Sequence, residues 1–187
     1  MPSRQPEFER VITLAPFATD EIDRLASWIP DAEALLIWAG PRYVWPLTAA
    51  QISSEVARAK EKPDALRMFV SRDGVRDAVG HIEIGDIDRR HGLAHLMRVL
   101  VAPASRGRGI GAAMVAAALR ICFEDLNLHR TELVVLDGNA GALATYLQLG
   151  FVREGLSRDT RLMPDGRRVG RVHMGLLARE CRERQRV

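Results

Sequence analysis

A glycine-rich segment between a predicted strand and a predicted helix constrains this chain more than any other feature. Residues 99–111 read Val-Leu-Val-Ala-Pro-Ala-Ser-Arg-Gly-Arg-Gly-Ile-Gly, so a strand leads through a loop with three glycines directly into a helix. Glycines let an anion approach the backbone, and a helix N-terminus offers free N–H donors with a partial positive charge. Arg106 and Arg108 add positive charge. The segment predicts a site for a phosphate or diphosphate, with a tight turn that binds nothing as the alternative.

The rest of the chain predicts a mixed α/β domain. A strand over Phe8–Leu14 and three helical segments up to Lys60 come first. Strands follow at Leu66–Ser71 and Ala78–Ile84, and the short Asp-Gly turn between them favours antiparallel pairing. The remaining expected elements are strand Ala94–Val101, helix Gly109–Asp125, strand Thr131–Leu136, helix Ala140–Leu149, a strand opening at Phe151, and a hairpin around residues 164–166. We expect one domain over residues 1–178 and a charged, disordered tail over 179–187.

Charge, cysteine content and hydropathy exclude several classes of function. The formal net charge of +3 at pH 7 is small for 187 residues, and acidic residues lie among the basic ones, so no nucleic-acid partner is expected. Cys122 and Cys181 form neither a disulfide framework nor a metal-ligand pattern, so no metal is expected. Arg120 interrupts the most apolar run, Gly111–Phe123, so no membrane partner is expected. The sequence predicts a cytoplasmic protein.

Two kinds of nucleotide site compete for the glycine-rich loop. No Gly-Lys-Ser/Thr is present, which argues against a P-loop. The segment Gly107–Ala112 fits the Rossmann pattern G-x-G-x-x-G/A, and Asp137 follows the next predicted strand where a ribose-binding acid could lie. Against a Rossmann-type dinucleotide enzyme, the strand ends at Val101, well before the first glycine, and a hairpin pattern replaces further βα units. That interpretation stays open as an alternative.

The segment resembles motif A of the GNAT superfamily, the acyl-CoA N-acyltransferases. That motif is a strand with V-x-V-x-P-x-x-R-G-x-G-x-G followed by a helix, and it is met here by Val99, Val101, Pro103, Arg106, Gly107, Gly109 and Gly111. A second family pattern, N-x-x-A-x-x-x-Y-x-x-x-G-F, is met by Asn139, Ala142, Tyr146, Gly150 and Phe151. The resemblance covers about residues 65 to 177 and implies the earlier elements only by analogy of fold. Within the superfamily, the predicted hairpin and N-terminal helices are most similar to the branch that acetylates ribosomal-protein N-termini.

The resemblance implies a fold, a cofactor and a set of binding residues. The fold would be a mixed α/β GNAT-type domain with a mostly antiparallel, twisted sheet of about seven strands and about four to five flanking helices. The co-substrate would be acetyl-CoA, with its diphosphate on the loop, its pantetheine arm along the strand and Asn139 holding that arm from the other side. The implied binding residues are Val99, Leu100, Val101, Arg106, Gly107, Arg108, Gly109, Ile110, Gly111, Ala112, Asn139 and Tyr146.

Acetyl transfer from a thioester to an amine needs a proton donor and a proton acceptor. Tyr146 is the candidate donor to the CoA thiolate, since a phenol is a reasonable acid there, and a packing tyrosine is the alternative. Glu83 is the candidate base, and it shares one strand face with His81. His95 and Glu132 are further possibilities for the base, and a solvated carboxylate is the plainer interpretation of Glu83.

The acceptor is the part of the reaction on which the sequence says least. The resemblance implies a primary amine, either a small molecule or a protein N-terminus, and allows a homodimer. The N-terminal aromatic residues could line an acceptor pocket or anchor helices. Six arginines between residues 153 and 171 could attract an acidic acceptor or lie exposed on a hairpin. A non-catalytic CoA-binding module is the third function, beside the N-acetyltransferase and the dinucleotide enzyme.

Overall fold

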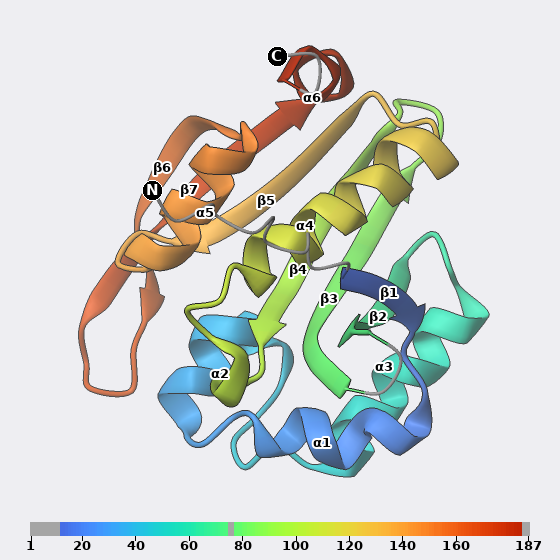
Figure 1. Ribbon diagram of the computed structural model, residues 1–187. Helices are drawn as coiled ribbons and strands as arrows, with labels where there is room; N and C mark the ends of the chain where they lie inside the picture. The colour runs from blue at the N-terminus through green and yellow to red at the C-terminus, as the bar shows by residue number, and fades with distance from the viewer. Residues whose placement is uncertain (1–11, 75–76, 185–187) are drawn as a thin grey trace, which may run out of the picture.

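The computed structural model of the chain describes residues 12–74 and 77–184 (Figure 1). Within these ranges one sheet of seven strands runs in the order β1-β2-β3-β4-β5-β7-β6. Neighbouring strands are antiparallel except β4 and β5, which are parallel. The strands are β1 (Ile12–Pro16), β2 (Leu66–Asp73), β3 (Asp77–Asp88), β4 (Leu93–Val101), β5 (Arg130–Leu136), β6 (Val152–Leu162) and β7 (Arg168–Leu177).

Helices cover both faces of this sheet. The α-helices are α1 (Ile22–Ser27), α2 (Ala32–Ala39), α3 (Ala49–Glu61), α4 (Ile110–Arg120), α5 (Ala140–Leu149) and α6 (Ala178–Arg184). Ile82 and Ile84 of β3 pack with Met114 of α4 on one face. Because strand side chains alternate between faces, the opposite face carries the β2 residues Leu66 and Met68, which pack with α1–α3. Figure 1 shows α4 crossing the sheet in front and α1–α3 gathered below.

Strands β4 and β5 separate soon after they begin. Their ladder joins residues 93–95 of β4 to residues 130–132 of β5, and no pair joins residues 96–101 to β5. Strand β4 also carries a bulge, because Glu83 pairs with Met97 and His81 with Leu100, which leaves one extra residue on β4. Arg98 takes the positive φ of 47° at this bulge. The bulge and the separation together leave one edge of β4 without a strand partner.

Most elements lie where the sequence predicts them, and the seven-stranded, mostly antiparallel α/β sheet confirms the expected architecture. One parallel pair in such a sheet is incompatible with the doubly wound parallel sheet of a Rossmann domain, so that alternative is excluded. The expected first strand, Phe8–Leu14, lies partly outside the described residues, and β1 runs on to Pro16. The described ranges hold six α-helices where about four to five were expected.

The C-terminal segment differs from the expected disordered tail over residues 179–187. Its described part forms α6, which extends from β7. The Glu180 carboxylate accepts a hydrogen bond from the Leu177 amide at 3.0 Å, and Ala178 is buried. Cys181 also packs against the core on the α4 face. A cap and an apolar contact therefore hold a helix that its charged composition alone did not indicate.

Gly80 of β3 lets α4 approach the sheet, and its replacement tests that packing. A Cβ atom at Gly80 would lie 2.8 Å from the Leu100 carbonyl oxygen and 2.9 Å from the Met114 sulfur. Gly80→Ala is expected to lower the free energy of unfolding by ~1–3 kcal/mol through overpacking. Gly155→Ala is the matched control, because Gly155 lies in β6 with open space around it. Denaturant unfolding measures both; equal stability of the two variants would contradict this account of the packing.

Candidate active site

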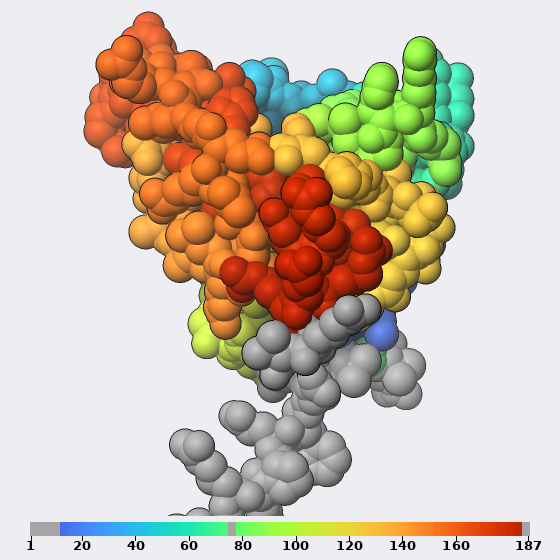
Figure 2. All heavy atoms as spheres, turned by 90° about the horizontal axis from the view of Figure 1, so that it is seen from above, coloured from blue at the N-terminus to red at the C-terminus, as the bar shows by residue number. Residues whose placement is uncertain are grey.

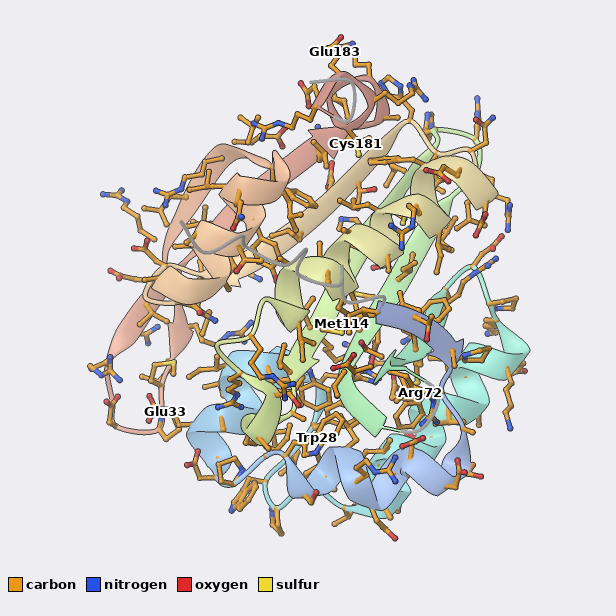
Figure 3. All side chains as sticks on the ribbon, viewed as in Figure 1. Trp28, Glu33, Arg72, Met114, Cys181 and Glu183 are labelled. Atoms are coloured by element: carbon orange, nitrogen blue, oxygen red, sulfur yellow. The ribbon has the colours of Figure 1, made fainter. Side chains whose placement is uncertain are left out.

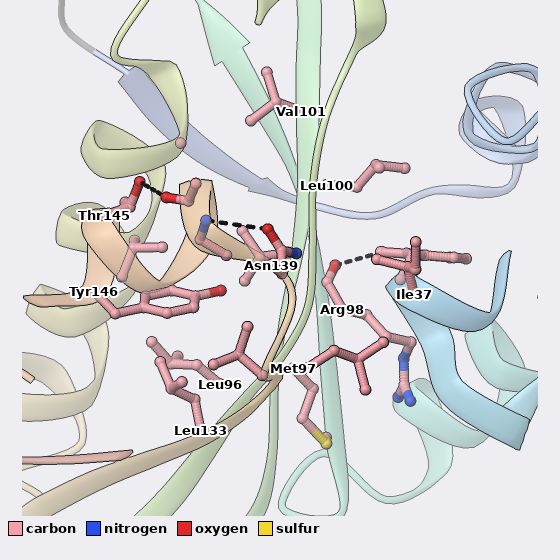
Figure 4. Close-up of a pocket in the computed structure, with 18 of the residues that line it drawn as sticks. Ile37, Leu96, Met97, Arg98, Leu100, Val101, Leu133, Asn139, Thr145 and Tyr146 are labelled. Atoms are coloured by element: carbon pink, nitrogen blue, oxygen red, sulfur yellow. Dashed lines mark hydrogen bonds between the residues drawn. The ribbon is translucent and has the colours of Figure 1, made fainter. Parts of the chain in front are cut away.

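A cleft of about 990 Å³ passes through the sheet where β4 and β5 diverge. From the α4 face it is lined by the loop after β4, the first turn of α4, and Asn139 and Tyr146 of the α5 segment. From the opposite face it is lined by α2 and by the β6–β7 hairpin. Figure 4 shows this arrangement, with Tyr146 and Asn139 on one side of β4 and Ile37 of α2 on the other. Two molecules that enter from opposite faces can therefore meet in the gap.

The glycine-rich loop gives the cleft an anion-binding end. Gly107 and Gly109 have φ values of 72° and 74°, which glycine adopts without strain, and a Cβ atom at either would meet nothing within 4 Å. Gly109 is also the N-cap of α4, and no side chain caps the helix there. The first N–H groups of α4 therefore remain available to an anion in the cleft.

The structure brings together most of the predicted binding residues. Those that line the cleft are Val99, Leu100, Val101, Arg106, Gly107, Gly109, Ile110, Gly111, Ala112, Asn139 and Tyr146. Arg108 does not line it; its guanidinium lies 4.0 Å from the Asp73 carboxylate. The Asn139 side chain caps α5 by accepting a hydrogen bond from the Ala142 amide at 3.2 Å, so its side-chain oxygen already has a partner.

Tyr146 is held rigidly with its hydroxyl directed into the cleft. Its ring packs edge-on against Phe151 at 5.8 Å, and only 8% of the residue is exposed. Figure 4 shows the hydroxyl pointing toward the gap between the strands. Within the described ranges this hydroxyl has no hydrogen-bond partner. Burial raises the pKa of Tyr146 to about 12, so the phenol keeps its proton at neutral pH and can donate it.

Glu83, the predicted base, lies beneath the cleft and is absent from its lining. The side chain is fully buried and accepts a hydrogen bond from Arg98 Nε at 2.6 Å, and His81 Nε2 lies 3.0 Å from its other oxygen. Burial raises the pKa of Glu83, but the hydrogen bond and charge of His81 and the charge of Arg98 outweigh burial and hold the pKa below its usual value. Glu83 is therefore an ionised partner of Arg98.

Arg98 lines the cleft. It connects the buried side chains of Glu83 and His81 to the bulge of β4, where Arg98 itself lies. The Trp38 indole Nε1 donates a hydrogen bond of 2.8 Å to the Arg98 carbonyl oxygen, so α2 is attached to the bulge as well. The sequence pattern did not single out Arg98. A charged residue in the otherwise apolar end of a strand was the available signal, since Arg98 stands between Met97 and Val99.

His95 is another titratable residue that lines the cleft. Of the three residues considered from the sequence as the base, namely Glu83, His95 and Glu132, His95 alone lines the cleft. Its Nε2 lies 3.1 Å from a carboxylate oxygen of Glu132, which also accepts a hydrogen bond of 2.6 Å from Arg130. A carboxylate can only accept, so Nε2 carries the proton and Nδ1 is the acceptor nitrogen. Nδ1 is buried and without a hydrogen-bond partner among the described residues.

The chain belongs to the acetyltransferase (GNAT) family, whose sequence pattern matches residues 32–151. This confirms the resemblance carried by the glycine-rich loop and by the segment from Asn139 to Phe151. Two relatives of named activity are similar to parts of the chain. The spermidine N(1)-acetyltransferase of Vibrio cholerae is 34% identical over 92 residues, which cover 49% of this chain and 53% of that protein. The L-amino acid N-acetyltransferase of Escherichia coli is 30% identical over 107 residues, 56% of this chain and 64% of that protein.

The chain thus spans between about half and just under two thirds of the length of these curated relatives. Solved structures match more completely. The crystal structure of the Vibrio cholerae spermidine N-acetyltransferase in complex with CoA and spermine superposes with a TM-score of 0.80 at 22% identity, covering 91% of this chain and 98% of that one. A point mutant of the same enzyme gives a TM-score of 0.79 at 23% identity, covering 92% of this chain and 99% of that one. These structures confirm the expected GNAT fold.

Proposed function

We propose that this protein transfers the acetyl group of acetyl-CoA to a primary amine. The observation that carries the proposal is the gap between β4 and β5, with the uncapped N-terminus of α4 at one end and Tyr146 beside it. The open space at Gly107 and Gly109 fits a diphosphate, and the unpaired edge of β4 fits an extended amide chain such as pantetheine. Bound acetyl-CoA would supply the acetyl thioester.

The residues around the gap have complementary roles in this reaction. Backbone N–H groups of Val99–Val101 would hold the pantetheine arm, and one of them would stabilise negative charge on the thioester oxygen. When the amine nitrogen bonds to the acetyl carbon, the carbon–sulfur bond breaks. Tyr146 would then give its proton to the departing thiolate. The amine's proton would pass to the free Nδ1 of His95, with Glu132 fixing the imidazole orientation.

Glu83 has a different role in this proposal from the one the sequence suggested. Its carboxylate is enclosed by Arg98 and His81 and does not face the cleft, so it has no direct path to the amine. We assign Glu83 a positioning role: its carboxylate holds the Arg98 guanidinium, and Arg98 lies at the bulge of β4 beside the gap.

A protein N-terminus as acceptor, the ribosomal-protein branch, a homodimer and a cytoplasmic location stay predictions. Within the described residues, no helix combines the length and apolar character needed to cross a membrane.

The proposal is tested first by ligand-dependent stability. Acetyl-CoA or CoA at 100 times its dissociation constant is expected to stabilise the fold by ~2.7 kcal/mol, and NAD and NADP to have no effect. Thermal unfolding with the four ligands in parallel measures this, and a thiol-release assay with an amine panel follows. Stabilisation by CoA without thiol release on any amine would leave a CoA-binding module, and stabilisation by neither CoA species would remove the cofactor assignment.

Tyr146→Phe tests the proton donor. The variant is expected to lower kcat by ~100-fold or more and to leave the affinity for acetyl-CoA nearly unchanged, because the ring packing stays and only the acid is lost. Steady-state thiol release and calorimetric titration measure the two quantities. Tyr43→Phe is the matched control, since Tyr43 is the other tyrosine of the chain and lies outside the cleft lining. An unchanged kcat in Tyr146→Phe would remove Tyr146 from the mechanism.

His95→Gln and Glu83→Gln, compared as a pair, separate the two candidate bases. We expect His95→Gln to lower kcat by ~100-fold, because the amine then loses the proton acceptor that lines the cleft. Glu83→Gln should lower kcat by less than His95→Gln does. Because Glu83 has a lowered pKa, the native protein should lose stability as the pH falls below about 4.5, and the Gln variant should lose less. A larger loss of kcat in Glu83→Gln than in His95→Gln would instead make Glu83 the base.

A further inference from the structure

The end of the cleft opposite the glycine-rich loop is walled by α2 and by the β6–β7 hairpin. An ion pair between Arg167 of the hairpin and Glu33 of α2, at 3.2 Å, joins these walls. Figure 3 shows Glu33 close to the hairpin tip. Figure 2 shows the surface hollowed between the hairpin strands and the β3–β4 turn, with β5 at the bottom of the hollow. An acceptor that enters from this face must pass the side chains of the hairpin.

Two of the six arginines between residues 153 and 171 line the cleft, Arg161 of β6 and Arg171 of β7. The Arg161 guanidinium lies over the end of α2, where a Cβ atom at Gly40 would be 3.3 Å from its Nη2. Its Nε is buried without a hydrogen-bond partner in the described ranges. Arg171 Nε donates a hydrogen bond of 3.1 Å to the Thr160 hydroxyl. No carboxylate among the described residues pairs with either guanidinium.

Other arginines close to the cleft do have carboxylate partners, so Arg161 and Arg171 differ from their neighbours. Arg167 pairs with Glu33 and Asp165, and Arg130 pairs with Glu132 and Glu154. Within the cleft, Arg98 is neutralised by Glu83. Arg106 lies on the glycine-rich loop, and Asp86 is the one carboxylate of the described lining. The half-buried guanidinium groups of Arg161 and Arg171 therefore have no carboxylate partner among the described residues at the end of the cleft opposite the glycine-rich loop, which we call the acceptor end.

The two guanidinium groups of Arg161 and Arg171 repel each other when no anion is bound between them. Burial and the nearby charge of Arg171 both lower the pKa of Arg161, although an arginine keeps its charge at neutral pH. Two like charges in a partly desolvated cleft repel, and an anion between them would relieve the repulsion and satisfy the free Nε. A polyamine would add further positive charge to the same place.

We propose that the acceptor is an amine that also carries an anionic group, a carboxylate or a phosphate, which Arg161 and Arg171 bind while the amine reaches the gap. This inference rests on the proposed acetyl transfer. It separates the chain from a polyamine acetyltransferase, even though one relative of known name acetylates spermidine. The apolar side chains of Ile37 and Val134, which line the same end, would contact the part of the acceptor between its two polar groups.

The test compares acceptors that differ only in the anionic group. Straight-chain ω-amino acids from glycine to aminohexanoate are each assayed beside the alkylamine of equal length, phosphoethanolamine is assayed beside ethanolamine, and spermidine is included. We expect one acidic acceptor to exceed its neutral partner in kcat/KM by roughly 10- to 100-fold, the size of a charge-assisted hydrogen bond. The length preferred in the series reports the distance from the arginines to the gap, and the carboxylate and phosphate arms identify the anion.

Variants then connect the preference to the two arginines. Arg161→Gln and Arg171→Gln should each lower kcat/KM for the acidic acceptor more than for its neutral partner, and so remove most of the preference for acidic acceptors. Arg153→Gln is the matched control, because Arg153 lies on β6 like Arg161 but is exposed and outside the cleft lining. A preference that survives in both cleft variants, or spermidine as the best acceptor, would overturn the inference.

Calorimetric titration of the acidic amines into the CoA-bound protein distinguishes failure of this inference from failure of the proposed function. Acetylation of acidic and neutral amines at equal rates would reject the anion site and retain the transferase. Binding of an acidic amine that is lost in Arg161→Gln, with no acetylation of any amine, would retain the anion site and reject acetyl transfer. If no amine is bound and no amine is acetylated, both the anion site and the proposed acetyl transfer are overturned.

Discussion

The bulge in β4 at Arg98 is the constraint on which the rest of the site depends. An extra residue there bends the strand just beyond His95, where its pairing with β5 ends, and beyond that point the sheet is open from one face to the other. The positive φ of Arg98 is unfavourable for a residue with a side chain, so the surrounding structure must hold it. Trp38 fixes its carbonyl from α2, and Glu83 fixes its guanidinium from β3. The buried ion pair therefore stabilises a backbone conformation.

The sequence predicted the conformation of the glycine-rich loop well, because that conformation depends on local backbone geometry. Gly107 and Gly109 adopt the left-handed conformation that only glycine takes easily, so their spacing is visible in the sequence. The order of strands and helices followed from hydrophobic periodicity for the same local reasons. Tyr146 lies where the second motif put it, facing the gap.

The rest of the site depends on contacts between distant segments, and the sequence could not supply these. Glu83 and His95 each precede an apolar strand position, and nothing local shows that Arg98 encloses one while the cleft reaches the other. The six hairpin arginines look alike in the sequence. The pairing of β6 with β7 shifts register between Ser157 and Arg161, and this register, which the sequence does not show, places Arg161 and Arg171 in the cleft lining. Likewise, α6 forms because Cys181 meets a core built by other elements.

The cleft therefore has two halves that would respond differently to mutation over evolutionary time. The half proposed for CoA uses main-chain N–H groups, which nearly every amino acid provides, so substitution there changes little as long as the glycines remain. The acceptor half is built from side chains on α2 and on the hairpin, where a single exchange at Arg161 or Arg171 alters the charge. A gene duplicate of this protein could acquire a new acceptor through a few hairpin substitutions and keep its co-substrate throughout.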